Sequence, residues 1–341
     1  MENRSTVAAY SAAHFAVDFA CCYLITRVLY KSSDIYSLYL IYNFCAFAMQ
    51  MPLGAAADRL NRNGLFALSG CILIALSYLA AGTLDDTAVA VILGIGNGAF
   101  HIGGGLDVLN LSGGRAAPLG VFVSPGALGL HLGRAAAKTS FDGGVIIQAA
   151  VLALGVVCAL SAKSESGFIS GNPYPEIGKL TARTAAAVGC FFIVVLIRAY
   201  FGLVMNFPWK GTGAYGFMLT CAVVLGKTAG GFLSDRFGPI KTSVLSLLSA
   251  SALFLMCENP LCGIAAVFLF NMTMPITLWS ICKIFDKCKG LTFGMLTFAM
   301  FVGLIPAYFG LSIYGGPAFC LCAVCSAAVL AAGLKLAGEK E

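Results

Sequence analysis

The chain has 341 residues, of which 59% are hydrophobic and only 11% are charged, and its mean hydropathy is +0.90. An ordinary soluble domain is excluded, because it has too little interior to bury so much apolar surface. A nucleic-acid-binding protein is excluded as well, since the net charge of +6 is not gathered on a soluble basic segment. The composition predicts a membrane protein with several spanning helices.

Twelve apolar runs along the chain are long enough to cross the roughly 30 Å of hydrocarbon in a bilayer as helices. A helix suits this task because it satisfies every backbone hydrogen bond within the segment. In chain order we expect spanning helices at 7–30, 34–57, 64–82, 87–107, 116–137, 143–161, 184–207, 213–234, 240–257, 260–282, 290–312 and 315–337. The fifth run is the least regular, because it is rich in glycine and contains Pro125.

The flanks of these runs predict how the chain is oriented. The first run lacks a small-residue cleavage site, which indicates a retained helix and not a signal peptide. Lys and Arg concentrate in the cytoplasmic loops of membrane proteins, and most of the loop Lys and Arg fall on the side of the N-terminus. We therefore expect both termini to lie in the cytoplasm. We also expect the protein to be a monomer in the lipid bilayer of the plasma membrane.

Ionisable residues inside spanning helices are costly and usually face a cavity, so they are the first candidates for a functional site. His14 and Asp18 are four residues apart on one face of the first helix, and Asn97 and His101 have the same spacing in the fourth. Counting residues from the helix ends places His14 and His101 at similar depth. An Asp–His pair is suited to proton coupling, and the alternative is a structural network that links the two helices.

A short motif occurs after the second expected span and again after the eighth. The first copy is "GAAADRLNR" at 54–62 and the second is "GFLSDRFGPIK" at 231–241. Each has a glycine, three further residues, Asp-Arg, one further residue, and then a turn former and a base. The residues that we expect to act in these loops are Gly54, Asp58, Arg59, Arg62, Gly231, Asp235, Arg236 and Gly238.

The residue types in the repeated loops indicate a physical role. Gly54 and Gly231 allow neighbouring helices to approach closely. Asp58 and Asp235 are able to cap the N-terminus of an adjacent helix or to pair with a base from the next helix. Such contacts would hold the cytoplasmic side closed in the outward-facing state. The alternative is that the loops only anchor the chain through their positive charge.

The longest polar stretch, residues 161–184, lies between the sixth and seventh runs and contains prolines, glycines and mixed charge. It predicts an N-terminal six-helix bundle at 1–161, a cytoplasmic linker at 162–183 and a C-terminal six-helix bundle at 184–341.

In the seventh and tenth spans the candidate residues are Arg198 and Asn271. An arginine does not lose its charge in a protein. Inside the membrane Arg198 therefore needs an anion, which would be a substrate carboxylate or phosphate, or Asp18 in one state. The intramembrane amides have helix packing as their alternative role.

Glycine-rich stretches and cysteines suggest other sites, which the sequence argues against. Gly226-Lys227-Thr228 resembles the end of a phosphate loop, but it lies within an apolar run and lacks the first glycine. The cysteines lie mostly inside apolar runs, and Cys282 and Cys288 have no second pair for zinc. No nucleotide, cofactor or metal site is predicted, and no nucleophile elbow or other catalytic motif indicates an enzyme.

With its twelve expected spans and the loop repeated in each half, the sequence resembles the major facilitator superfamily, whose loop signature is G-x-x-x-D-R-x-G-R/K-R/K. Asn61 replaces the second glycine of that signature in the first copy, and Lys241 is displaced in the second. The resemblance implies two six-helix bundles related by pseudo-twofold symmetry, around a central cavity lined by the first, fourth, seventh and tenth helices. Transport would then proceed by rocking between inward-open and outward-open states.

Three stretches are similar to the fosmidomycin-resistance branch and related drug exporters of that superfamily: "HFxxD" in the first helix, "GNGAFHIGGG" in the fourth and "PLGVFVSPGALGLHLG" in the fifth. The antiporter signature of the fifth helix is met at Gly120, Pro125 and Gly129, whereas Ser124 and Leu128 stand where glycine is usual. The arginine expected in the fourth helix is replaced by Gly94.

The resemblance implies secondary transport of a small organic solute, with proton-coupled efflux as the first expectation. Proton-coupled uptake of an organic anion or a sugar is the alternative, and a transport-inactive scaffold or sensor is a further one. The substrate itself is not readable from the sequence.

Overall fold

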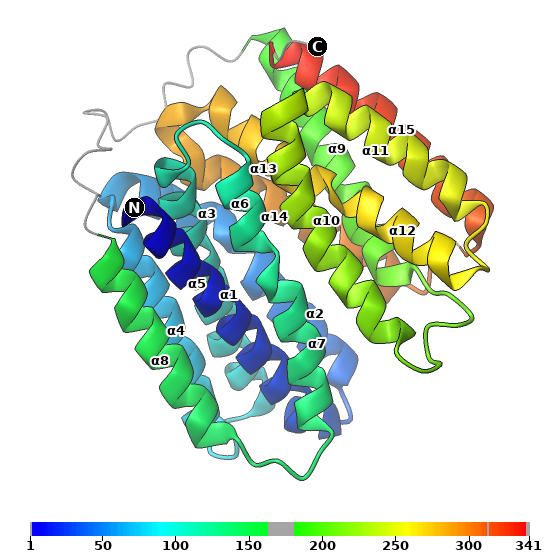
Figure 1. Cartoon of the computed structure of the whole chain (residues 1–341). Coiled ribbons are helices and arrows are strands. Elements are labelled where there is room, and N and C mark those ends of the chain that lie inside the picture. Colours follow the sequence, from blue (N-terminus) through cyan, green and yellow to red (C-terminus); the bar gives the residue numbers. More distant parts are fainter. Residues whose placement is uncertain (1, 163–180, 312–313, 339–341) are drawn as a thin grey trace. The chain divides into compact units, whose positions relative to one another are not determined.

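The computed structural model describes residues 2–162, 181–311 and 314–338, and these residues are almost entirely helical (Figure 1). The first helices are α1 (Glu2–Arg27), α2 (Ile35–Asn43), α3 (Gln50–Leu60), α4 (Asn63–Ala80), α5 (Asp86–Leu111), α6 (Ala117–Val123), α7 (Pro125–Ala137) and α8 (Gly144–Ser161). The others are α9 (Ala182–Val204), α10 (Tyr215–Phe237), α11 (Pro239–Phe254), α12 (Pro260–Asn271), α13 (Thr273–Ile284), α14 (Lys289–Tyr308) and α15 (Gly316–Leu336).

Ten helices among the described residues are long and apolar enough to cross a membrane. They correspond to ten of the twelve predicted spans. The ninth predicted span is α11, which is apolar but has only 16 residues. The fifth is divided into α6 and α7, because the proline ring at 125 removes a backbone donor and ends the first segment at Val123. The structure supports an all-helical membrane protein, and the number of twelve spans stays a prediction.

The described residues form two compact units, whose boundaries do not coincide with the two halves of the sequence. Unit 1 takes in the described parts of Met1–Gly113, Pro125–Tyr174 and Lys287–Phe298. Unit 2 takes in those of Gly114–Ser124, Pro175–Asp286 and Ala299–Glu341. Each unit thus contains one short segment from the opposite half of the chain. The predicted bundle boundaries stay a prediction, and most of the predicted linker at 162–183 lies outside the described residues.

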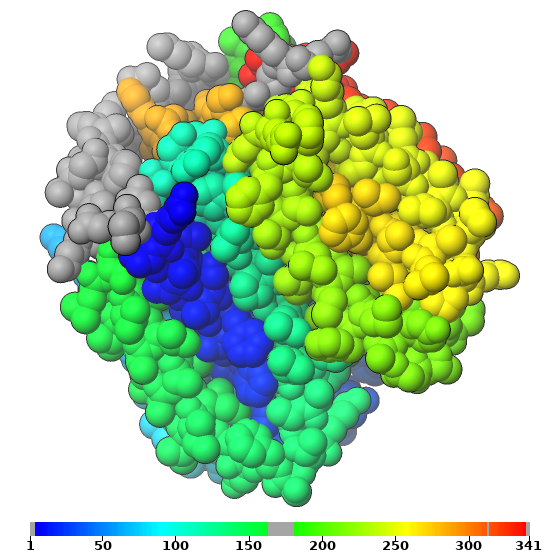
Figure 2. All heavy atoms as spheres, viewed as in Figure 1, coloured from blue at the N-terminus to red at the C-terminus, as the bar shows by residue number. Residues whose placement is uncertain are grey.

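In unit 1, α1 packs against α7 and α8, and α4 packs against α5 and α8 (Figure 1). Figure 2 shows part of α1, in dark blue, at the surface between α8 and α7. The opposite face of α1 is buried, with Tyr10, Ala13 and Val17 fully covered. That buried face carries the polar residues of the candidate site.

Glycines allow the closest approach of helices in unit 1. A methyl group added at Gly103 of α5 would overlap backbone atoms of Asn63 and Ala67 in α4. Gly129 of α7 approaches the backbone of Phe15 in α1 in the same way. Small residues at helix contacts serve this purpose in membranes, and Gly103 and Gly105 of the glycine run at 103–105 both lie in such close contacts.

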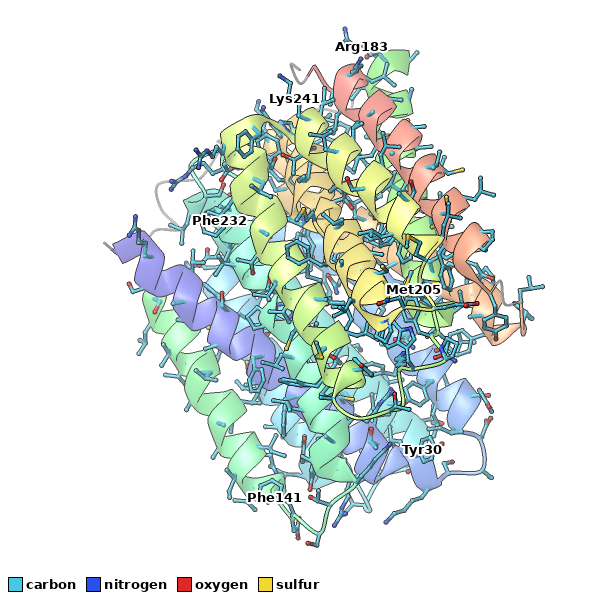
Figure 3. All side chains as sticks on the ribbon, turned by 45° about the vertical axis from the view of Figure 1, so that its right-hand side comes forward. Tyr30, Phe141, Arg183, Met205, Phe232 and Lys241 are labelled. Atoms are coloured by element: carbon cyan, nitrogen blue, oxygen red, sulfur yellow. The ribbon has the colours of Figure 1, made fainter. Side chains whose placement is uncertain are left out.

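In unit 2, α15 packs against α9 and α11, and α10 packs against α12 and α6. The buried rings of Phe254 and Phe319 meet edge to face at the α11–α15 contact. At the end of α15, Arg183 donates hydrogen bonds from its guanidinium to the backbone oxygens of Lys335 and Leu336 (Figure 3). The last carbonyls of a helix lack intrahelical donors, and the guanidinium supplements the bond that the carbonyl of Lys335 accepts from the N–H of Gly338 at 3.1 Å.

Large apolar side chains lie exposed on the outside of both units. Val145 is 79% exposed, Leu65 54% and Phe232, labelled in Figure 3 on α10, 55%. A soluble protein would bury most such side chains, whereas a bilayer solvates them. The surface therefore agrees with the hydropathy of the helices.

Candidate functional site

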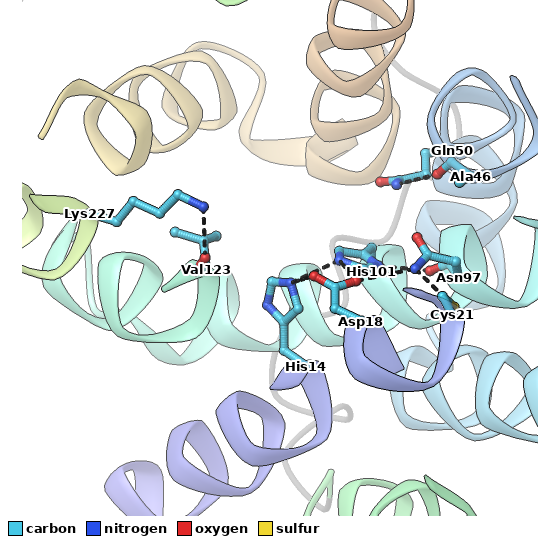
Figure 4. A network of polar contacts seen from close by, with 9 residues as sticks. All are labelled: His14, Asp18, Cys21, Ala46, Gln50, Asn97, His101, Val123 and Lys227. Carbon is cyan, nitrogen blue, oxygen red and sulfur yellow. Dashed lines mark hydrogen bonds and ion pairs between the residues drawn. The ribbon is translucent and has the colours of Figure 1, made fainter. Parts of the chain in front are cut away.

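Three ionisable side chains converge in the interior of unit 1. His14 Nε2 and Asp18 Oδ2 lie 3.2 Å apart on consecutive turns of α1. His101 of α5 brings its Nε2 to 2.9 Å from His14 Nε2 and to 3.7 Å from Asp18 Oδ1 (Figure 4). The i,i+4 spacing on α1 and the packing of α1 against α5 produce this convergence. We call these residues the His–Asp–His cluster.

Asn97 contacts two members of the cluster, Asp18 through its side chain and His101 through its backbone carbonyl. Its side-chain amide donates to Asp18 Oδ1 at 3.3 Å, and it also contacts Cys21 Sγ at 3.5 Å. Its backbone carbonyl lies 2.8 Å from His101 Nδ1. A carbonyl oxygen only accepts, so the proton of neutral His101 is on Nδ1 and its Nε2 presents a lone pair.

The cluster contains one carboxylate, that of Asp18, and among the described residues its charge is not balanced by a neighbouring Lys or Arg. The exposed fractions of the His14, Asp18 and His101 side chains are 7%, 11% and 15%. Among the described residues, no Lys or Arg lies within ion-pair distance of Asp18. A buried carboxylate is stabilised by hydrogen bonds or by a nearby positive charge, and here the two imidazoles are the groups able to supply that charge by taking up a proton.

Gly126, in the first turn of α7, allows the backbone of this helix to lie directly against the cluster. A methyl group added at this glycine would overlap both Asp18 Oδ2 and His14 Nε2. Helix α7 packs closely on α1, and the contact leaves no room for a side chain at 126. Any larger residue there would displace two of the three converging side chains or push the helices apart.

The first repeated loop places Asp58 at a helix N-terminus within unit 1. The Asp58 carboxylate accepts hydrogen bonds from the backbone of Gly290 at 2.8 Å and of Leu291 at 2.9 Å, in the first turn of α14. Gly54 packs directly on Gly290, where a methyl group would overlap the backbone. The free N–H groups and the positive end of the helix dipole both favour a carboxylate at this position.

The second repeated loop repeats this geometry within unit 2. Asp235 Oδ1 accepts from the backbone of Ala116 at 2.7 Å, and Oδ2 accepts from Ala117 at 3.0 Å, where α6 begins. Gly231 packs against the same backbone. Of the two contacts predicted for these aspartates, the structure has the helix cap, and neither carboxylate forms an ion pair with a described Lys or Arg.

The turns that follow the two aspartates have left-handed backbone. Asn61 has a φ of 48° and Gly238 a φ of 90°, as expected for residues that tolerate this conformation. The arginines of the loops, Arg59, Arg62 and Arg236, are exposed. The guanidinium of Arg236 lies over the ring of Phe237 at 5.2 Å from its centroid, whereas the glycines and aspartates of the loops make the contacts with the capped helices described above.

The remaining predicted residues lie in unit 2, apart from the cluster in the chain. Arg198 of α9 has a buried Nη1 without a hydrogen-bond partner among the described residues. Asn271 donates its amide to the carbonyl of Val267 in its own helix at 2.8 Å. Lys227 of α10, which was not a predicted site residue, donates to the carbonyl of Val123 in α6 at 3.3 Å, so its ammonium contacts a neighbouring helix.

The sequence reasoning missed a second buried carboxylate in unit 1. Asp107 of α5 is 3% exposed and accepts from Tyr10 at 2.9 Å and from Asn63 at 3.3 Å. The predicted fourth span, 87–107, ends at this residue, whereas α5 continues to Leu111. Its position six residues after His101 in a continuous helix was the signal that would have included it.

Comparisons of the structure with solved structures give the fold. No protein-family profile and no curated protein matches the chain. The chain is similar to a major facilitator superfamily transporter, FucP, in the outward conformation, with 15% identity, a TM-score of 0.64 and 99% of each chain covered. It is also similar to a variant of the E. coli fucose:proton symporter FucP, with 14% identity, a TM-score of 0.62 and coverage of 98% of this chain and 99% of that one.

A third similar structure is the human organic anion transporter MFSD10 (TETRAN), with 15% identity, a TM-score of 0.67 and coverage of 98% of this chain and 97% of that one. At this level of identity the likeness defines the fold, which is that of major facilitator superfamily transporters. The resemblance to the drug-exporter branch stays a prediction.

Proposed function

We propose that this protein is a secondary active transporter that moves a small organic solute across the membrane by alternating access. The observation that carries the proposal is the likeness to transporter structures over at least 98% of the chain. A likeness that covers the whole length supports a shared architecture, including two bundles around a central cavity. Function is argued from the site, since fold alone does not fix it.

Proton coupling is part of the proposal, and the His–Asp–His cluster supports it. His101 Nε2 presents a lone pair toward His14 Nε2 at 2.9 Å, so this contact is a hydrogen bond when His14 carries a proton on Nε2. Asp18 adds a negative charge beside the same point. One proton gained or lost here changes the net charge of a buried site, which is how a gradient would enter the transport cycle.

Efflux is our first candidate for direction, on the sequence similarity to exporters. Uptake is the second candidate, and Arg198 favours an organic anion in that case. Its buried Nη1 has no partner among the described residues, and a carboxylate or phosphate would satisfy it. One similar structure is an organic anion transporter and another is a fucose:proton symporter, so anions and sugars are both suitable test compounds.

The test has two stages. A thermal-stabilisation screen of purified protein with fucose, other sugars and a panel of organic anions would identify a ligand. Its flux into and out of proteoliposomes would then be measured with and without a pH gradient. We expect flux that responds to the gradient in the wild type, and flux without that response in Asp18→Asn, because an amide does not bind the proton.

The matched control is His131→Gln, which removes the remaining one of the three histidines and lies outside the cluster. It is expected to transport like the wild type. Wild-type pH dependence in Asp18→Asn would contradict proton coupling at this site. If ligand binding is detected but no flux follows under any gradient, the protein is a sensor or scaffold and not a transporter.

A further inference from the structure

The three converging atoms of the His–Asp–His cluster are spaced like the ligands of a metal ion. Zinc binds imidazole nitrogen at about 2.0–2.1 Å and carboxylate oxygen at about 2.0–2.2 Å, in a tetrahedron whose ligands are therefore about 3.3 Å apart. Here His14 Nε2 lies 2.9 Å from His101 Nε2 and 3.2 Å from Asp18 Oδ2, while His101 Nε2 lies 3.7 Å from the other carboxylate oxygen, Oδ1. One ligand atom from each residue lies within 4.8 Å of the other two. Small shifts of side chains would bring all three to coordination distance.

The hydrogen bonds around the cluster are those of a metal-binding second shell. A histidine ligand usually donates its other ring N–H to a carbonyl or carboxylate, which fixes the tautomer and aims the free nitrogen at the ion. His101 does so through Nδ1 and the backbone oxygen of Asn97, at 2.8 Å. The side chain of Asn97 also holds Asp18 Oδ1 at 3.3 Å. Two of the three ligands are thus oriented by one residue.

The backbone of α7 lies directly against two of the ligands, because Gly126 has no side chain. A methyl group added there would overlap both Asp18 Oδ2 and His14 Nε2. The ligand side chains retain exposed fractions of 7–15%, so the cluster is not sealed from solvent. A fourth coordination position would remain for water or another small ligand.

We propose that His14, Asp18 and His101 bind one divalent first-row transition-metal ion, with Zn²⁺ as the probe. Two imidazoles and one carboxylate suit such ions, whereas Mg²⁺ and Ca²⁺ take oxygen ligands. The sequence predicted no metal site, because its three ligands come from two helices separated by 87 residues between His14 and His101. The inference concerns binding alone and does not depend on transport.

The experiment is a titration of the purified full-length protein in detergent with Zn²⁺, in competition with a chromophoric chelator. We expect one Zn²⁺ per chain in the wild type. His14→Gln, Asp18→Asn and His101→Gln should each weaken binding at least tenfold, while the control His131→Gln should leave it unchanged. Excess Mg²⁺ should not displace Zn²⁺. Wild-type protein that binds no Zn²⁺, or the same affinity in Asp18→Asn, would overturn the proposal.

Two further variants test the site without removing a ligand. Gly126→Ala keeps all three ligands, but its methyl group would overlap Asp18 Oδ2 and His14 Nε2 and push them out of coordination geometry, so it should abolish stoichiometric binding. Asn97→Ala removes the side chain that orients Asp18, and a loss of about 10–100-fold in affinity is expected. Unchanged Zn²⁺ affinity in Gly126→Ala would mean that the ion binds elsewhere.

The fourteen free cysteines of the chain are competing ligands for zinc, so a spectroscopic readout is needed. Co²⁺ bound by nitrogen and oxygen gives visible ligand-field bands without the near-ultraviolet band of a cobalt–thiolate bond. We expect the former spectrum, and its loss in His101→Gln. A thiolate band in the wild type would assign the ion to cysteine and overturn the proposal. Unfolding temperature and size-exclusion elution would establish that each variant is folded, and Zn²⁺ should raise the unfolding temperature of the wild type and not of Gly126→Ala.

Discussion

At the scale of single residues, the position of a polar group decides whether it joins the site or only its own helix. Asn97 and Asn271 are both amides in apolar helices. Asn97 is 3% exposed and reaches Asp18 on another helix, whereas Asn271 donates to Val267 one turn earlier in its own helix. The sequence does not distinguish the two residues, and only their hydrogen-bond partners in the structure show that they have different roles.

This difference predicts unequal effects on stability. Asn97→Ala removes a buried bond between α5 and α1 and leaves Asp18 Oδ1 without its amide donor, which should lower the free energy of unfolding by about 1–2 kcal/mol. Asn271→Ala removes a bond that a helix does not need and should cost less than about 0.5 kcal/mol. Thermal unfolding in one detergent would measure both. Equal losses in the two variants would contradict the assignment of Asn97 to an interhelical network.

At the scale of elements, helix contacts in unit 1 depend on the absence of side chains at a few glycines. Gly103 brings α5 against the backbone of α4 at Asn63 and Ala67. Gly189 of α9 lies in the middle of a helix too, but nothing lies within 4 Å of the point that its β-carbon would occupy. Alanine substitutions at these two positions therefore distinguish the effect of close helix packing from the effect of intrinsic helix propensity.

We expect Gly103→Ala to destabilise the protein by about 1–3 kcal/mol, because the methyl group forces two backbones apart. Gly189→Ala should be neutral or should stabilise by up to about 1 kcal/mol, since alanine restricts the unfolded chain and favours a helix. The midpoints of thermal unfolding compare the two variants directly. A stabilising Gly103→Ala would mean that α4 and α5 are not in close contact.

At the scale of the whole molecule, the two repeated loops perform the same task in the two units. Asp58 caps the start of α14 within unit 1, and Asp235 caps the start of α6 within unit 2. In each case the capped segment comes from the opposite half of the sequence. We propose that release of these caps accompanies the change between transport states, as the gate role predicted for the loops requires.

Because of these caps, we expect Asp58→Asn to change both the hydrogen exchange of the capped helix turn and the transport rate. Asp58→Asn replaces a carboxylate that accepts two N–H bonds with an amide that accepts one, at a cost of about 1 kcal/mol, or roughly fivefold in an equilibrium constant. Hydrogen exchange at Gly290 and Leu291 should accelerate, and the transport rate should change. Asp235→Asn should act in the same way at Ala116 and Ala117.

The control for this prediction is Asp85, which caps its own helix by accepting from Ala88 at 3.0 Å. Asp85→Asn should affect exchange only in the first turn of α5 and leave the transport rate unchanged. A change in transport that is equal in Asp85→Asn and Asp58→Asn would show that loss of any helix cap is sufficient, and the gate role would then be wrong.

The sequence by itself determined the helical class and the approximate position of the helices, because both follow from local chemistry. A run of apolar residues must be helical in a bilayer, Pro125 must interrupt the fifth run, and Asn61 and Gly238 suit left-handed turns. The i,i+4 spacing also placed His14 with Asp18 on one face of their helix, and Asn97 with His101 on one face of theirs.

Only the tertiary structure decided which atoms those faces bring together. The 2.9 Å approach of His14 to His101 depends on the register of α1 against α5, and no local pattern encodes a register. The same holds for Asp58 and Asp235, whose partners lie more than a hundred residues away in the chain. Hydrophobic length and turn chemistry depend on residues close together in the sequence. The caps made by Asp58 and Asp235 and the convergence of His14, Asp18 and His101 depend on how distant helices pack.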